Sequence, residues 1–172
     1  MTHLSACLSS VVLLVLAPVA ARAEDRVPAP TGEVVLEISG KITKTNAGDR
    51  LSLDLAQLRA LPMVSVETAT PATGDAVHVF EGIQAAALRG LAGTEGTELR
   101  MTALDDYSVT APIAGILAAG GVFALSMDGA PLDPEGFGPV WLLYDYDGLG
   151  PEKAAIVNDT MSPWALATIV VE

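Results

Sequence analysis

The chain has 172 residues, with 21 acidic and nine basic side chains and a formal charge of −12. This charge repels phosphate backbones and anionic lipid headgroups, so nucleic acids and acidic membrane surfaces are not expected as partners. The one cysteine, Cys7, excludes a disulfide framework within a single chain.

The first segment has the pattern of a secretory signal peptide. Leu8–Ala20 is an apolar run of 13 residues, and the small-residue motif Ala21–Ala23 follows it. This arrangement predicts cleavage after Ala23, and the run is shorter than the ~20 residues that span a bilayer. We therefore predict a signal peptide over residues 1–23, a periplasmic protein, and no membrane insertion after cleavage. The alternative is an uncleaved anchor.

Cleavage leaves residues 24–172, with eight basic and 21 acidic side chains and a formal charge of −13. Because Cys7 leaves with the signal, the mature chain has no thiolate nucleophile and no cysteine ligand for a metal. Its 149 residues are enough for one domain with a core that buries about 70% of the unfolded surface. We predict a flexible, proline-rich lead-in over residues 24–32 and one domain over residues 33–172.

The domain begins with alternating apolar residues over 33–39, which predict a half-buried strand. Asp54 precedes a short helix over residues 55–61 that Pro62 ends. Further helices are expected over residues 83–91 and 113–121. Other extended segments are expected, in chain order, over residues 50–54, 63–70, 76–82, 97–103, 107–112, 121–127, 139–146 and 165–172.

Residues 147–163 between the last two extended segments are expected to form a loop of about 17 residues, a length often associated with function. About eight short strands, three short helices and no internal repeat favour an α+β fold. The helices are too short, and the strands too hairpin-like, for a doubly wound sheet.

The sequence lacks the residue motifs that several classes of enzyme require. The sequence contains no G-x-S-x-G, no P-loop and no complete G-x-G-x-x-G. His78 is the one histidine after the signal, so a zinc site with two imidazoles is excluded. Paired acids occur at Asp105–Asp106 and at Asp145 and Asp147, and either pair fits acid–base work or ordinary turn chemistry.

Three segments together resemble the molybdopterin-binding domain of the sulfite oxidase family: "VFEGIQAAALRGL" (79–91), "ALDDYSVTAPI" (103–113) and "MDGAPLDPEGFGPVWLLY" (127–144). The similarity runs from about residue 32 to residue 172, and the third segment is the most specific. The resemblance implies a single α+β domain of the sulfite-oxidase type, with mixed sheets and short helices.

The sequence departs from that family where the family binds molybdenum. The family's cysteine strand corresponds here to "VETATPAT", which contains Thr68 and Thr70 and no sulfur. A neutral hydroxyl is a poor ligand for a site built on soft sulfur. Leu142 and Pro163 stand where the resemblance implies cationic residues. The chain therefore has fewer cationic side chains with which to bind the phosphate of the molybdenum cofactor.

Some small exported members of this family lack the cysteine and bind pterins, acting with membrane enzymes of cyclic-di-GMP signalling. The resemblance therefore implies a pterin without metal as the ligand and the periplasmic domain of a membrane sensor as the partner. A pterin needs flat apolar walls and a carboxylate for its amino and N–H edge. The candidate residues are Asp106 or Asp145 as the acceptor, Tyr107, Tyr144 and Trp164 as walls, and Thr68 and Thr70 as hydroxyl donors.

For each of these residues a structural role remains an alternative, because tyrosines are common in sheets and tryptophans in cores. Three functions stay open. The first is a non-catalytic pterin-binding regulator, and the second is a molybdopterin-dependent oxidoreductase with an atypical metal site. The third is a binding module whose pocket is filled and whose surface contacts other proteins.

Overall fold

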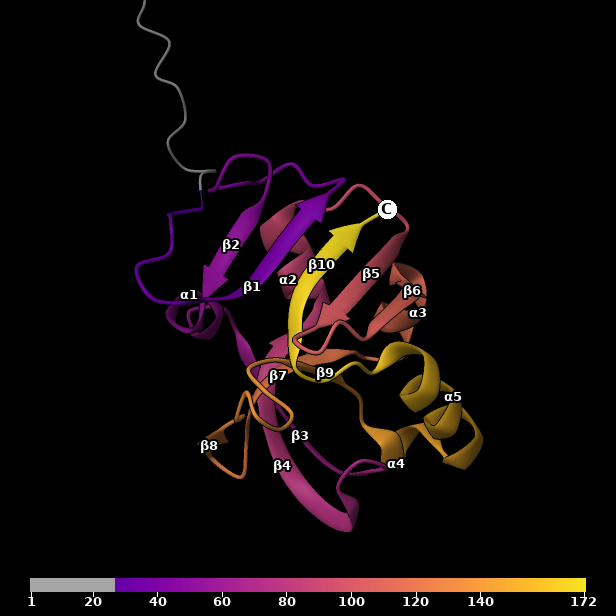
Figure 1. Ribbon diagram of the computed structural model, residues 1–172. Helices are drawn as coiled ribbons and strands as arrows, with labels where there is room; N and C mark the ends of the chain where they lie inside the picture. Colours follow the sequence, from indigo (N-terminus) through magenta and orange to yellow (C-terminus); the bar gives the residue numbers. More distant parts are fainter. Residues whose placement is uncertain (1–26) are drawn as a thin grey trace, which may run out of the picture.

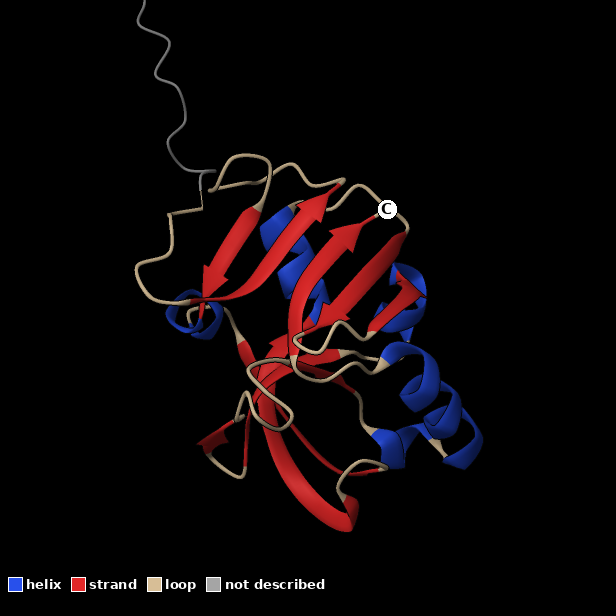
Figure 2. Ribbon diagram, viewed as in Figure 1, coloured by secondary structure: helices blue, strands red, loops and turns tan. Residues whose placement is uncertain are grey.

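Two β-sheets and five short helices make up the part of the chain that the structure, a computed structural model, describes, residues 27–172 (Figure 1, Figure 2). The predicted signal peptide and the start of the predicted lead-in lie outside the described residues. The predicted α+β class is confirmed, and the structure shows that the strands form two sheets.

The first sheet has the strand order β2-β1-β10-β5-β6. Strands β1 and β10 run parallel, and the other neighbours are antiparallel, so this sheet is mixed. The extended segments expected over 97–103 and 107–112 predict a hairpin across residues 104–106, and this hairpin is confirmed as the β5–β6 pair. The strands are β1 (Val34–Gly40), β2 (Leu51–Asp54), β5 (Glu98–Ala103), β6 (Ser108–Pro112) and β10 (Leu166–Val171).

The second sheet is antiparallel, with the order β3-β4-β7-β8, and β9 pairs with β7. Its core side is held by Phe80, Phe123 and Trp141, which are at most 2% exposed. The strands are β3 (Met63–Thr70), β4 (Gly74–Gln84), β7 (Val122–Met127), β8 (Ala130–Pro131) and β9 (Trp141–Leu143).

The helices are α1 (Leu55–Arg59), α2 (Ala85–Ala92), α3 (Ile113–Ala118), α4 (Tyr146–Leu149) and α5 (Pro151–Met161). Helices α2 and α3 cover one side of the first sheet (Figure 2). None of the helices in residues 27–172 has the length and apolarity needed to cross a membrane.

The predicted loop over residues 147–163 is wrong, because α4 and α5 occupy most of it. Helix α5 buries only Val157, so it carries little of the apolar periodicity by which a helix is recognised. Pro151 contributes to the error, since proline resembles a loop signal but is favoured in the first turn of a helix. The strand expected over 139–146 is limited to Trp141–Leu143 because Tyr146 begins α4.

Asp54 caps α1, as predicted. Its Oδ1 accepts a hydrogen bond from the Gln57 backbone N–H (2.8 Å), and the Gln57 side chain accepts one from the Asp54 N–H (3.1 Å). The other carboxylate oxygen accepts hydrogen bonds from the N–H groups of Thr31 and Gly32 at 2.8 and 2.9 Å. One buried carboxylate therefore both starts a helix and ties residues 31–32 to the domain.

We expect Asp54→Ala to lower the melting temperature by about 3–6 °C near neutral pH, because it removes a helix cap and two further hydrogen bonds. The Gln57 N–H, with those of Gly32 and Thr31, holds the pKa of Asp54 below its ordinary value of 3.8. The contribution of Asp54 is therefore present above pH 3.8 and is lost as the pH falls through the lowered pKa of the folded state. Thermal unfolding followed by circular dichroism at several pH values measures both effects.

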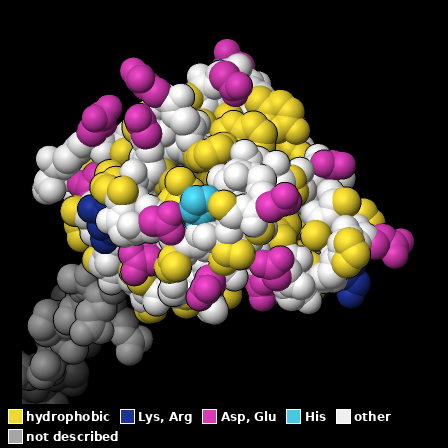
Figure 3. Space-filling model, turned by 90° about the horizontal axis from the view of Figure 1, so that it is seen from below, with side chains coloured by type: hydrophobic (Ala, Val, Ile, Leu, Met, Phe, Trp, Pro, Cys, Tyr) yellow, Lys and Arg dark blue, Asp and Glu magenta, His cyan; other side chains and the backbone are white. Residues whose placement is uncertain are grey.

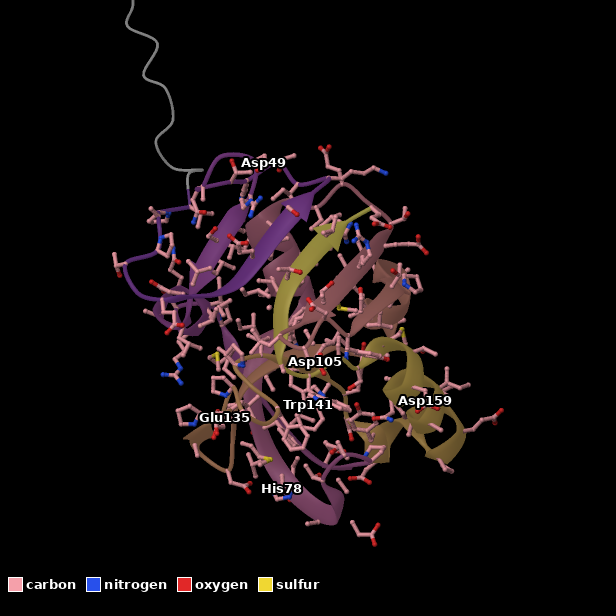
Figure 4. The ribbon with its side chains drawn as sticks, viewed as in Figure 1. Asp49, His78, Asp105, Glu135, Trp141 and Asp159 are labelled. Carbon is pink, nitrogen blue, oxygen red and sulfur yellow. The ribbon has the colours of Figure 1, made fainter. Side chains whose placement is uncertain are left out.

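Asp49→Ala is the matched control, because the Asp49 side chain is 93% exposed and reaches Arg50 only at 3.6 Å. Figure 4 shows Asp49 at the edge of the domain. A drop for Asp54→Ala no larger than the drop for Asp49→Ala, or a difference that stays constant into acid, would contradict the capping role.

Candidate functional site

A cleft of about 460 Å³ lies between the β5–β6 hairpin and the C-terminal end of α5. Figure 1 shows α5 beside the β5–β6 hairpin, followed by the segment that returns to β10. We call it the Tyr107–Trp164 cleft. It is lined by Ala103, Asp105, Tyr107, Val109, Asn158, Asp159, Ser162, Pro163 and Trp164.

Two aromatic side chains in this cleft are open to solvent. Tyr107 is 56% exposed and Trp164 is 44% exposed. Trp164 rests edge-on against Phe137 and Trp141, with ring centroids 6.1 and 6.3 Å apart, and Phe137 stacks on Trp141 at 4.5 Å. This aromatic base fixes the Trp164 ring while leaving much of it accessible, which is the arrangement that a flat ligand needs.

Two carboxylates share the cleft, Asp105 at the hairpin turn and Asp159 on α5 (Figure 4). Asp105 Oδ1 accepts a hydrogen bond from the Tyr107 N–H at 3.0 Å, and Asp159 Oδ1 accepts one from the Asn158 amide at 3.2 Å. Within residues 27–172, the second oxygen of each carboxylate has no hydrogen bond. The C-terminal end of α5 adds partial negative charge. The cleft therefore favours ligands rich in N–H donors and disfavours phosphate.

A buried hydroxyl supports the floor of the cleft. Ser162 Oγ accepts a hydrogen bond from Trp141 Nε1 (3.2 Å), donates to the Leu142 carbonyl (2.8 Å), and lies 2.6 Å from the Tyr146 hydroxyl. Burial raises the pKa of Tyr146 to about 12, although the Ser162 hydrogen bond acts in the opposite direction. Tyr146 therefore stays neutral and serves as a structural hydrogen-bonding group in this network.

Of the seven residues selected from the sequence, Tyr107 and Trp164 come together in this cleft. Asp106 lies beside it in the β5–β6 turn, where its positive φ of 67° and its N–H bond to the Ala103 carbonyl shape the chain. The lining carboxylate of the pair is the neighbouring Asp105.

Tyr144 is fully buried, and its hydroxyl donates to the Met161 carbonyl at 2.9 Å. Burial, the main cause, raises its pKa above the ordinary value of 10.0. Asp145 caps α4 by accepting a hydrogen bond from the Gly148 N–H at 2.9 Å. Both residues therefore contribute to the packing of the segment that leads into α5.

Thr68 and Thr70 lie on β3, away from the Tyr107–Trp164 cleft. Thr68 is fully buried, and its hydroxyl accepts hydrogen bonds from the N–H groups of Tyr146 (3.0 Å) and Asp147 (3.4 Å). Thr70 pairs with the Thr73 hydroxyl at 2.9 Å. Thr70 also lines a second cleft of about 540 Å³, in which the one aromatic residue, Tyr146, is only 4% exposed.

The donor set around these threonines does not fit a molybdenum-bound cofactor. The hydroxyl of Thr68 is committed to the backbone of α4, and a neutral hydroxyl is a poor substitute for thiolate at such a metal. Residues 27–172 contain no cysteine and no group of three histidine, cysteine or acidic side chains placed to hold a metal. The side chains on β3 therefore supply no ligand through which that cofactor could react.

Sequence reasoning missed three polar residues of the cleft, namely Asp105, Asn158 and Asp159. The first was recognised as half of an acidic pair, but the adjoining Asp106 was preferred as the ligand acceptor. The other two fall in the segment taken for a loop, and no local pattern predicts that α5 brings them to the β5–β6 hairpin.

Comparison with solved structures shows a distant similarity of fold. The fold is similar to part of the sulfane dehydrogenase SoxCD from Paracoccus pantotrophus, with a TM-score of 0.55 and 14% sequence identity. The match covers 79% of this chain but only 37% of the matched chain. No family model and no curated protein sequence matches this chain. At this identity the similarity concerns the fold alone.

Proposed function

We propose that the protein is an exported, non-catalytic pterin-binding protein that acts as a ligand-dependent regulator of a membrane signalling partner. The observation that carries the proposal is the coincidence of two solvent-exposed aromatic side chains and two carboxylates in one cleft. Its volume of about 460 Å³ falls within the ~300–1,000 Å³ range of small-molecule sites.

The chemistry of the cleft is suited to a free pterin. Tyr107 and Trp164 offer apolar ring surfaces for the flat heterocycle. The exocyclic amino group and adjacent ring N–H can donate together to the open oxygen of Asp159 or Asp105, and a charged acceptor strengthens such bonds. The proposal thus keeps two of the three aromatic walls expected from the sequence, without the buried Tyr144. It assigns the acceptor role to these two carboxylates instead of Asp106 or Asp145.

The absence of cationic side chains from the cleft lining also supports a ligand without phosphate. A phosphorylated cofactor would meet two carboxylates and the negative end of α5. The similarity to a dehydrogenase fold favours the alternative, a molybdopterin-dependent oxidoreductase with an atypical site. The donor set at Thr68 and Thr70 argues against that alternative.

The test is mass spectrometry and metal analysis of protein purified from its own periplasm, followed by fluorescence titration with neopterin and neopterin monophosphate. We expect a bound or bindable pterin, substoichiometric molybdenum, and weaker binding of the phosphorylated form. Stoichiometric molybdenum would support the oxidoreductase instead. Failure of both probes to bind protein freed of any native ligand would overturn the proposal.

A further inference from the structure

Strand β3 is one edge of the second sheet, and its outward backbone groups can be identified. Val79 of β4 exchanges hydrogen bonds with Asp128 at 2.9 and 2.7 Å, so its backbone groups point toward the β7 side. Glu67 lies opposite Val79 in the β3–β4 register. In an antiparallel pair, two residues that lie opposite each other either exchange both backbone hydrogen bonds or exchange none. Because the backbone groups of Val79 face β7, this pair exchanges none, and the Glu67 N–H and carbonyl point away from β4.

The other end of β3 agrees with this assignment. The N–H of Ala69, two residues further on, donates outward to Asp147 Oδ2 at 3.2 Å. Alternation then places the N–H and carbonyl of Ser65 on the same outer side. Within residues 27–172, no hydrogen bond reaches the outward backbone groups of Ser65 or Glu67. Strand β3 contacts β4 along its length and α4 at its C-terminal end.

The edges of the first sheet are covered, in contrast. On β2, the Asn46 side-chain amide accepts from the Ser52 N–H and donates to the Ser52 carbonyl, both at 2.8 Å. On β6, helix α5 packs against the strand. An open edge on β3 is therefore a specific feature of the second sheet, and such an edge is a template for an added strand.

The side chains of β3 indicate which strand would fit. Val64 and Val66 are half-buried and pack against the core, whereas Ser65 and Glu67 are exposed on the opposite side of the sheet. Glu81, opposite Ser65 on β4, adds a second exposed carboxylate there. Figure 3 shows the side of the molecule that carries the end of the β3–β4 hairpin. Acidic side chains are spread over this side, and basic side chains lie only at its margins.

We propose that the β3 edge binds an extended segment of another protein, in which apolar residues alternate with basic ones. The segment would hydrogen-bond to the outward groups of Ser65 and Glu67, as in other cases where a peptide extends a sheet. Its apolar side chains would cover Val64 and Val66, and its basic side chains would meet Glu67 and Glu81. A second copy of this chain is disfavoured, because both edges would be acidic and each chain carries a charge of −12.

This inference goes beyond the proposed function, because it needs no ligand in the Tyr107–Trp164 cleft. The two can fail separately. Trp164→Ala, which removes a cleft wall, should leave binding at the β3 edge unchanged, and a blocked β3 edge should leave pterin binding unchanged.

The experiment uses an eight-residue peptide that alternates valine with lysine, titrated against the folded protein by fluorescence anisotropy. Ser65→Pro deletes an N–H that points outward, so it removes a bond to the peptide without removing a bond to β4. Ser65→Ala retains that N–H and is the matched control. We expect Ser65→Pro to bind the peptide at least about tenfold more weakly than Ser65→Ala, with similar melting temperatures for the two variants.

Reversing the charge of Glu67 provides an independent test of the proposal. Glu67→Lys should weaken binding of the valine–lysine peptide and improve binding of a valine–glutamate peptide. Equal peptide affinity in Ser65→Pro and Ser65→Ala, or no binding of the valine–lysine peptide to the unaltered protein, would overturn the proposal. So would sedimentation showing a dimer that Ser65→Pro dissociates, since the edge would then be occupied by a second copy.

Discussion

Replacing Trp164 with alanine is expected to weaken neopterin binding by roughly 10- to 100-fold, the range that stacking of a flat base on an aromatic side chain supports. Trp164 is the wall with the best-defined position, since Phe137 and Trp141 contact its ring edge-on. The remaining wall, Tyr107, cannot replace it, because a flat ligand held on one side stays open to water on the other. Fluorescence titration with neopterin measures the change.

The controls for this prediction separate binding from folding. Trp164→Phe retains an aromatic surface and should lose far less affinity than Trp164→Ala. Leu104→Ala removes a side chain that is 56% exposed, as Tyr107 is, but that does not line the cleft. We expect no change in affinity for that variant. Equal losses for Trp164→Ala and Leu104→Ala, at matched melting temperatures, would exclude the cleft as the pterin site.

Ser162→Ala is expected to lower the free energy of unfolding by about 3 kcal/mol, because it leaves several buried polar groups without a partner. Trp141 Nε1, the Leu142 carbonyl and the Tyr146 hydroxyl all meet at Ser162 Oγ, and Ser162 is only 4% exposed. An unpaired donor or acceptor in such a place loses its water without compensation. Urea unfolding with and without the substitution gives the difference.

Ser126→Ala is the matched control for this substitution. Ser126 is also buried, at 8% exposure, but it makes a single side-chain hydrogen bond, to the exposed carboxylate of Glu81 at 3.2 Å. Water can replace that partner, so we expect a loss below about 1 kcal/mol. Similar losses for the two serines would mean that the Ser162 network contributes no more than one ordinary hydrogen bond.

Local sequence patterns predicted much of the fold, because strands, helix caps and hairpins depend largely on interactions between residues that are close in sequence. The alternation in β1, the extended segment of β3, the Asp54 cap of α1 and the β5–β6 hairpin were all predicted from residues close in sequence. Helix α5 was missed for the same reason, since it buries only Val157 and most of its side chains are polar or small. A helix of that kind is stabilised by tertiary contacts such as those with β6, which is too far away in the chain to share a sequence window with α5.

The candidate site shows the same division. Sequence chemistry pointed to aromatic and acidic residues, and Tyr107 and Trp164 do line one cleft. The choice of Asp105 over Asp106 depends on the direction in which a tight turn aims each side chain. The presence of Asp159 depends on the packing of α5 beside the hairpin. The separation of Thr68, Thr70 and Asp145 from the cleft is likewise a consequence of which strands and helices pair.

By itself, the sequence determined the acidic charge, the lack of cysteine after Cys7, the α+β class and the limits of most strands, because composition and short-range periodicity are enough to specify these. Only the tertiary structure decided that Thr68 is a buried support for α4, that two carboxylates and two aromatic rings meet in one cleft, and that β3 keeps an open edge. These outcomes depend on contacts between residues far apart in the chain, and the packing that selects among such contacts acts on the whole domain at once.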